Sequence, residues 1–428
     1  MNRIQIAIFG TIGVLVLVTV LLLTGVLPGI KPREGQPFTL ELWGIDDDPA
    51  LWQEIANAYR DGVARGATIN YRKKNPETYE TELVNALASG KGPDIFLLKD
   101  EWLERHKDKI NPLPDGTNTY QKKNLKSIFA DSVAEAIVTD DGALVGTPLA
   151  FDTLALFYNR DYFNSANIPN TPQTWEELAA DSQTLTKQSE VGSITRSGAA
   201  LGTASNVEHA ADIFLVLLYR EGGTVIDQAA GKSALRNQAT QSSLLFYTSF
   251  ASPIKKTYAW NAFFENSLAA FANGDAAMAF GFAADVPKVA SLNPQLNFDV
   301  APLPQTSKSE VAVNYGRFDL WAVSRISKNQ EQAWNFLLWL QSKDVQKKYI
   351  DARGLPPARR DLVSSKPPRE YLVVFYDQVL SARTLPIVLG DSLPKILDDM
   401  IEAVVNRKVT IDQAIARAES EINALLRE

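Results

Sequence analysis

Charged and aromatic residues stand directly after apolar, strand-like runs in the first hundred residues of the chain. The run "FTLELW" (38–43) leads into "GIDDD", and the run "DIFLL" (94–98) leads into "KDEW". Carboxylates and cations form charge-assisted hydrogen bonds with hydroxyl groups, and aromatic rings cover the apolar faces of a ligand. These residue types therefore favour recognition of a polar small molecule. The candidate ligand contacts from the two runs are Trp43, Asp46, Lys99, Glu101 and Trp102.

The elements that must position these residues alternate between strand and helix. Strands are predicted over 38–43, 67–71 and 94–98, and helices are predicted to begin after Asp48 and Asn75, each with a proline in its first turn. This order is typical of an α/β fold whose parallel sheet is covered on both faces. Ligands bind such sheets at the carboxyl ends of the strands, although a solvated strand end is also commonly polar.

Composition and motifs argue against several classes of function. Of the 428 residues, 45% are hydrophobic and 22% charged, and the net charge of −7 without a basic block argues against nucleic-acid binding. The chain has no cysteine and only two histidines, which excludes thiolate and histidine-rich metal sites. The first strand-to-helix turn, "GIDDDPA", has one glycine and three carboxylates and would repel a phosphate. We expect no metal and no cofactor.

An enzyme is disfavoured because no nucleophile or metal-hydrolase motif is present. A glycosidase needs two carboxylates about 5 to 10 Å apart, and Asp152 and Glu101 could be assigned that role. Nothing in the sequence marks either of them as an activated acid. We therefore predict no catalytic residue.

The N-terminal segment differs from the rest of the chain because residues 4–27 contain no charge. About 20 apolar residues are enough to cross a bilayer as a helix. The run is longer than the core of a signal peptide and no A-x-A pattern follows it, so we predict an uncleaved membrane anchor followed by a tether over 28–37. A cleaved signal peptide is the alternative. The flanking basic residues do not decide which side of the membrane the rest of the chain occupies.

Several longer segments, taken in order, carry a family resemblance. They are "ASGKGPDIF", "GTPLAFDTLALFYNRDYFNSANIPNTPQTWEELAA", "AFANGDAAMAF", "FDVAPLP" and "AWNFLLWLQSKDVQKKYIDARGLPPARRDL". Together they resemble the extracellular solute-binding proteins of ABC importers, in the sugar-binding family that includes maltose-binding protein. The resemblance runs from about residue 38 to the end. The absence of cysteine departs from the lipid-anchored members of the family, so the apolar helix itself would be the tether.

The resemblance implies a two-lobed, periplasmic-binding-protein-like α/β fold, each lobe a sheet flanked by helices, that closes on a ligand by hinge bending. It places the first crossing between the lobes near Pro148 to Asp152 and the second near Pro302 to Pro304. The predicted segments are 38–148 plus 310–350 for lobe I and 153–304 plus 355–428 for lobe II.

The resemblance also adds candidate ligand contacts from segments that would face the cleft between the lobes. These are Asp152, Trp260, Phe282, Tyr315, Arg317 and Phe318. Each could instead be structural: the aromatic residues could be core residues, and Arg317 could pair with a carboxylate. Of the histidines, His106 is predicted to lie on the solvated, charged face "ERHKDK", and His209 to start an apolar helix.

The predicted function is a membrane-tethered binding protein, with its soluble domain outside the cell, that captures a carbohydrate and delivers it to an ABC permease. Its partners would be a mono- or oligosaccharide, the permease, and the lipid bilayer through residues 4–27. Within the same fold, a polyamine, a peptide or a glycerol phosphate is an alternative ligand. A sensor or adhesion ectodomain is an alternative function.

Overall fold

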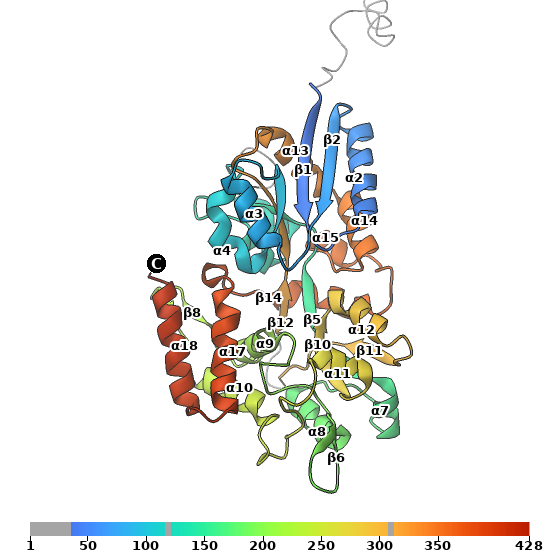
Figure 1. Ribbon diagram of the computed structural model, residues 1–428, viewed down its shortest axis with the longest axis vertical. Helices are drawn as coiled ribbons and strands as arrows, with labels where there is room; N and C mark the ends of the chain where they lie inside the picture. The colour runs from blue at the N-terminus through green and yellow to red at the C-terminus, as the bar shows by residue number, and fades with distance from the viewer. Residues whose placement is uncertain (1–35, 116–120, 307–311, 428) are drawn as a thin grey trace, which may run out of the picture.

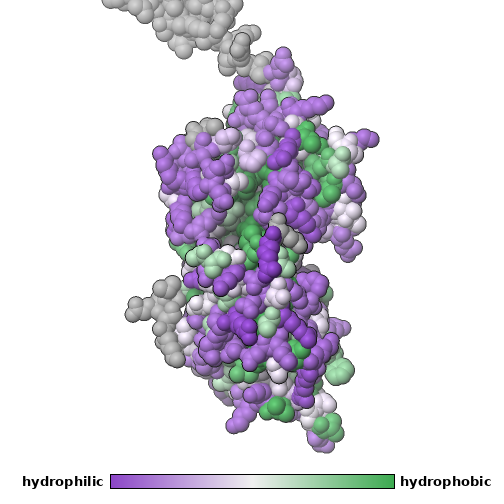
Figure 2. Space-filling view, turned by 90° about the vertical axis from the view of Figure 1, so that its left-hand side faces the viewer, coloured by the Kyte–Doolittle hydropathy of each residue, from purple (hydrophilic) through white to green (hydrophobic). Residues whose placement is uncertain are grey.

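The computed structural model describes residues 36–115, 121–306 and 312–427, which form two lobes stacked along the long axis of the molecule (Figure 1). The predicted membrane anchor over 4–27 lies outside these residues. Within them, no helix is both long and apolar enough to cross a bilayer. Seen from the side, a hollow with hydrophobic residues opens in the upper lobe just above the junction of the lobes (Figure 2).

The sheet of the first lobe has five strands in the order β2-β1-β3-β13-β4. Strand β1 pairs in parallel with β2 and β3, as the strand–helix alternation predicts, whereas β13 is antiparallel to both β3 and β4. The strands are β1 (Phe38–Gly44), β2 (Ala67–Lys73), β3 (Ile95–Lys99), β4 (Thr147–Pro148) and β13 (Asp319–Val323).

Helix α2 anchors the core of this lobe through Trp52. The Trp52 ring packs edge-on against Trp321 of β13, with a centroid distance of 4.7 Å, and stacks on Tyr71 of β2 at 5.3 Å. The helices of the first lobe are α2 (Pro49–Gly62), α3 (Tyr79–Ala88), α4 (Leu103–His106), α5 (Lys122–Ile128), α6 (Asp131–Ala136), α13 (Gln330–Leu340), α14 (Lys343–Arg353) and α15 (Arg360–Val363), and the short 3-10 turn η1 (Asp100–Trp102) precedes α4.

The sheet of the second lobe has the order β10-β5-β12-β14, and β11 also pairs with β5. The long strand β5 is antiparallel to β10, β11 and β12 and carries a nearly continuous buried run, as expected for a strand covered on both faces. The strands are β5 (Asp152–Asn159), β10 (Met278–Phe282), β11 (Phe298–Ala301), β12 (Asn314–Arg317) and β14 (Ala382–Arg383); two small hairpins are formed by β6 (Lys187–Gln188) with β7 (Ile194–Arg196) and β8 (Ile226–Asp227) with β9 (Lys232–Ser233).

The helices of the second lobe include α9, in which every residue but the last is buried, and the terminal pair α17 and α18 at the lower left of Figure 1. The helices are α7 (Arg160–Ser165), α8 (Trp175–Leu185), α9 (Ala210–Arg220), α10 (Gln238–Ser249), α11 (Ser267–Asn273), α12 (Val286–Leu292), α16 (Leu372–Gln378), α17 (Ser392–Val405) and α18 (Ile411–Leu425), with the 3-10 turn η3 (Ala283–Asp285) after β10.

Two extended segments cross between the lobes side by side. The first runs from β4 to β5 through 149–151. The second runs from β12 to β13 through Phe318, with Arg317 paired to Asp152 and Leu320 paired to Pro148. The two segments approach so closely at Gly316 that a β-carbon there would lie 2.5 Å from the ring of Phe151.

The position of the second crossing differs from the prediction. We expected it near Pro302 to Pro304, but β11 and β12 both belong to the sheet of the second lobe, and the chain leaves that sheet only after Arg317. Residues 312–317 therefore lie with the second lobe and not with the first. The proline pattern marks the end of β11, which is a turn within one lobe.

Short-range signals in the sequence match the helix ends. The Asp48 side chain accepts a hydrogen bond from the backbone N–H of Ala50 at the start of α2, and Thr174 caps α8 through the N–H of Glu177. Thr410 and Gln413 form the predicted capping box of α18. The prediction for His106 is wrong: its side chain is buried, and its Nε2 lies 2.7 Å from Glu80.

Candidate functional site

A cavity of about 200 Å³ lies between the lobes, at the two crossing segments. The first lobe lines it with residues from the β1–α2 turn, β13 and α14, and the second lobe with residues from β10, η3 and the start of α9. Its volume is below the range of about 300–1,000 Å³ that is usual for pockets of drug-sized ligands. This conformation therefore accommodates a small solute, and a larger one requires the lobes to move apart.

Arg317, at the end of β12, joins the two lobes beside this cavity. Its Nη1 donates to Glu101 of the first lobe at 2.9 Å, while its Nε and Nη2 donate to Asp212 of α9 at 3.1 and 2.8 Å. The Asp212 side chain is only 1% exposed. Burial alone would raise the pKa of Asp212, but Arg317 and His209 outweigh burial and hold that pKa below its usual value.

His209 continues this charged cluster within the second lobe. Its Nε2 lies 2.8 Å from Asp285, and its Nδ1 lies 3.6 Å from Asp212. Burial lowers the pKa of His209, but the carboxylates of Asp212 and Asp285 outweigh that effect and raise it to about 9, so the ring is a cation at neutral pH. The residue adopts φ 61°, a left-handed conformation that is strained for histidine. The cluster therefore holds His209 in a conformation that histidine adopts only uncommonly.

Asp47 and Arg353 form a second charged group on the side of the first lobe. The Asp47 carboxylate accepts hydrogen bonds from Trp52 at 2.7 Å and Tyr349 at 3.0 Å, and Nη1 of Arg353 lies 2.9 Å from it. Burial raises the pKa of Asp47, and Arg353 opposes this. These contacts tie the β1–α2 turn to α14, so this wall of the cavity is preorganised.

Asp152 stands where the first crossing segment enters the second lobe. Its two carboxylate oxygens accept hydrogen bonds from the backbone N–H groups of Ala283 and Ala284, each at 2.9 Å. Burial raises the pKa of Asp152 to about 7 despite these bonds, and the neighbouring Asp285 adds to the rise. Asp152 therefore positions the β10–η3 turn and also adds negative charge to the cavity.

Asp319 and Asp46 line the cavity differently, because among the described residues neither carboxylate has a hydrogen-bond or ion-pair partner. The Asp319 side chain is exposed at the wall of the cavity. Partial desolvation by the surrounding protein raises the pKa of Asp319 to about 7, and Lys99 partly opposes the rise. The cavity thus offers unoccupied hydrogen-bond acceptors from the first lobe.

Apolar and aromatic side chains complete the walls. Phe282 and Phe318 line the cavity from the second lobe and the crossing segment, and Trp321 lines it from the first lobe. The His209 ring meets Phe282 edge-on at a centroid distance of 4.7 Å. Aromatic walls with a few convergent polar groups are typical of sites for small polar molecules.

Of the residues predicted from the sequence, the structure brings five to the cavity wall: Asp46, Asp152, Phe282, Arg317 and Phe318. Glu101 lies beside the cavity through its ion pair with Arg317. Tyr315 is fully buried and lies in β12, the strand that ends at Arg317. These residues come from segments far apart in the sequence.

Four other predicted residues do not line the cavity in this conformation. Trp43 is half-buried and lies under the ammonium group of Lys74, 3.7 Å from its ring centroid. Lys99 lies 5.1 Å from the ring centroid of Trp102, which is itself 9% exposed. Trp260 is fully buried, stacked on Phe264 and hydrogen-bonded through its Nε1 to Asn206.

Sequence reasoning missed several residues that the structure places at the cavity. They are Asp47, His209, Asp285, Tyr349 and Arg353. Asp47 is adjacent to the predicted contact Asp46, so the polar residues after the first strand already indicated its position. The pairing of His209 with Asp285 spans 76 residues, and no local pattern signals it. Among the described residues, no group of three acidic or histidine side chains is arranged to hold a metal ion.

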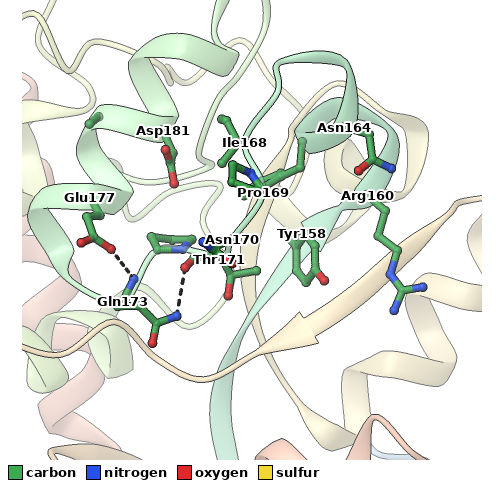
Figure 3. Close-up of a pocket in the computed structure, with 13 residues that line it drawn as sticks. Tyr158, Arg160, Asn164, Ile168, Pro169, Asn170, Thr171, Gln173, Glu177 and Asp181 are labelled. Atoms are coloured by element: carbon green, nitrogen blue, oxygen red, sulfur yellow. Dashed lines mark hydrogen bonds between the residues drawn. The ribbon is translucent and has the colours of Figure 1, made fainter.

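A second, larger hollow of about 810 Å³ lies on the second lobe, away from the junction (Figure 3). It is lined by Tyr158, by the loop 168–173, and by Glu177 and Asp181 of α8. Glu177 accepts a hydrogen bond from the backbone N–H of Gln173 at 2.7 Å, so part of its polar lining serves the cap of α8. One lobe alone forms this hollow. The smaller cavity, which both lobes and both crossing segments build, is therefore the stronger candidate for a ligand.

The sequence profile of a known family matches residues 54–371, which is more than half of the chain. The family is described as bacterial extracellular solute-binding protein. The chain belongs to this family. The interlobe cavity of this solute-binding protein is therefore its candidate solute site.

Known relatives agree with this membership. A protein of Brucella abortus, named as a binding protein, is 23% identical over 391 residues, which cover 88% of this solute-binding protein and 90% of the relative. Among solved structures, the cyclic α-maltosyl-1,6-maltose binding protein of Arthrobacter globiformis gives a TM-score of 0.76 at 20% identity, covering 91% of this chain and 99% of that one. The sugar-binding protein MalE of Xanthomonas citri gives a TM-score of 0.73 at 18% identity, covering 91% and 98%. At these identities the likeness establishes a shared two-lobed fold.

Proposed function

We propose that this protein captures a carbohydrate in its interlobe cavity, outside the cell, and delivers it to an ABC permease. In the same proposal, residues 4–27 anchor the chain in the membrane, and the protein acts by binding and not by catalysis. The family is extracellular and binds solutes. Structural relatives are described as binding cyclic α-maltosyl-1,6-maltose, maltotetraose, mannobiose and α-D-tagatose.

The observation that carries the proposal is the composition of the cavity between the two lobes. Asp319 and Asp46 supply free acceptors for sugar hydroxyl groups, and Phe282 and Phe318 supply apolar surface for the face of a sugar ring. Because the cavity lies at the crossing segments, bending there changes the distance between its walls. A solute that contacts both walls favours the closed arrangement by its differential affinity for the two states.

The charged contact between Arg317 and Glu101 gives this closure a structural basis. It joins the lobes beside the cavity, and a second interlobe pair joins Arg105 of α4 to Asp391 at 2.8 Å. Both contacts must break for the lobes to separate. A permease that recognises both lobes would then distinguish the loaded, closed protein from the open one.

The test is thermal unfolding of the full chain in detergent, with mono- and oligosaccharides, spermidine, a peptide mixture and glycerol phosphate as separate additives. A carbohydrate present at 100 times its Kd should stabilise the protein by about 2.7 kcal/mol, and the same sugar should give a saturable change in tryptophan fluorescence. A shift with spermidine, peptide or glycerol phosphate alone would contradict the carbohydrate assignment. For the anchor, deletion of residues 4–27 should release the protein from isolated membranes, and retention on them would refute that part.

A further inference from the structure

The cations that line the interlobe cavity are already bound to carboxylates. Arg317 donates to Asp212 and Glu101 through three of its nitrogens, and His209 lies between Asp285 and Asp212. Arg353 is held by Asp47 and by the backbone carbonyl of Asp46. Each of these three cations is therefore already compensated by at least one carboxylate.

The carboxylates of the cavity outnumber these cations. Five aspartates line it, against three cationic side chains, and Asp319 and Asp46 are the two without a bonded partner among the described residues. Asp319 lies in the electrostatic field of Asp46, Asp47 and Asp100, all of which disfavour its ionisation. The nearby cation Lys99 makes no ion pair with it, and the Lys99 ammonium group lies 5.1 Å from the ring centroid of Trp102.

The excess of carboxylates over cations in the cavity favours a ligand that carries a positive charge. A neutral sugar satisfies the hydrogen-bonding capacity of Asp319, but it displaces water from the carboxylate and leaves the negative charge only partly compensated, by Lys99. A cationic group beside Asp319 provides both a charge-assisted hydrogen bond and charge compensation. An anionic group would be repelled by the free carboxylates and would meet no free cation among the lining residues.

We infer that the carbohydrate bound in this cavity carries a basic nitrogen, as in an amino sugar, and that Asp319, assisted by Asp46, receives the charged amine. This inference rests on the proposed function, because it narrows the carbohydrate to a class. Phe282 and Phe318 would cover the ring, as for a neutral sugar. The specificity therefore comes from the first lobe, which supplies both free carboxylates.

The test compares matched ligands on the full chain in detergent by isothermal titration calorimetry at pH 7.5. Glucosamine and its oligosaccharides are paired with their N-acetylated forms, in which the amine is neutral, and with glucose and glucuronate. We expect the amine forms to bind about tenfold to a hundredfold tighter than the N-acetyl forms, as a hydrogen bond between charged groups implies. Equal or tighter binding of the neutral or anionic forms would overturn the inference and leave the proposed carbohydrate function standing.

Variants separate the role of Asp319 from a general effect of charge. Asp319→Asn should abolish most of the preference for the amine, because it should weaken binding of the amine form more than binding of the N-acetyl form. The matched control is Asp140→Asn, which removes an exposed carboxylate outside the cavity and should keep the full preference. Loss of preference in both variants, or in neither, would overturn the assignment to Asp319. If no sugar binds at all and spermidine does, the proposed function itself fails, and the inference fails with it.

Discussion

Arg317→Met removes the guanidinium group that connects Glu101 in the first lobe with Asp212 in the second. The two ion pairs differ in burial: the Asp212 side chain is 1% exposed, whereas Glu101 is 15% exposed. Removing one partner of a buried ion pair costs about 3–5 kcal/mol, because the remaining charge stays desolvated. We therefore expect Arg317→Met to lower the free energy of unfolding by about 3–5 kcal/mol.

Glu101→Gln isolates the interlobe half of the same cluster. It leaves the two hydrogen bonds from Arg317 to Asp212 in place and replaces only the contact with the first lobe. A hydrogen bond to a charged group is worth about 1.5–3 kcal/mol, and because Gln keeps an acceptor for Nη1, the loss of unfolding free energy should not exceed the lower end of this range. Most of the stabilisation by Arg317 is therefore predicted to lie within the second lobe.

The assay is urea unfolding followed by both tryptophan fluorescence and far-UV circular dichroism, since coincident transitions justify a two-state free energy. The control is Arg72→Met, whose ion pair with Glu41 joins neighbouring strands, with Arg72 62% and Glu41 29% exposed. An exposed pair of this kind is worth about 0–1 kcal/mol. If Arg317→Met is no more destabilising than Arg72→Met, the buried cluster does not stabilise the fold. If Glu101→Gln lowers the free energy of unfolding as much as Arg317→Met does, the stabilisation by Arg317 comes from the contact between the lobes, and the prediction from burial is wrong.

Three further predictions concern His209, Asp319 and Trp260. Burial lowers the pKa of His209, but the carboxylates of Asp212 and Asp285 outweigh it and raise this pKa from 6.5 to about 9, so the stabilisation by His209 is complete below pH 6.5 and lost as the pH rises to about 9. Unfolding measured across that window should show this decline in the wild type and a smaller one in His209→Gln; equal slopes would refute it. Burial raises the pKa of Asp319 to about 7, so its ionisation opposes folding, and Asp319→Asn should be more stable than the wild type at pH 8 but not at pH 4. A loss of stability at pH 8 would show that Asp319 has a partner in the fold. Trp260→Ala should cost about 3–5 kcal/mol in unfolding free energy because the ring is fully buried, with ligand affinity in calorimetry changed little; a stable variant with weakened binding would place Trp260 at the ligand.

Some features of the site could be reached from sequence because they depend on segment type alone. Charged residues follow the apolar strand β1 at the carboxyl edge of a parallel sheet, and this pattern predicted that the region after β1 would face a ligand. Asp46, which lies in that region, lines the cavity. The family resemblance placed Asp152, Phe282, Arg317 and Phe318 in the facing segments. Which side chains remain unpaired was not predictable, because a partner can come from any part of the chain.

Local signals in the sequence determined where the helices of this protein begin, and long-range contacts determined which side chains are paired and which line the cavity. The caps at Asp48, Thr174 and Thr410 each depend on residues within three positions, so the sequence alone predicts where those helices begin. Arg317, in contrast, binds partners 216 and 105 residues away. Nothing near Arg317 in the sequence distinguishes a ligand contact from a structural ion pair. The tertiary structure decides this, because it brings Glu101 and Asp212 within hydrogen-bond distance and leaves Asp319, two residues farther along, without a partner among the described residues.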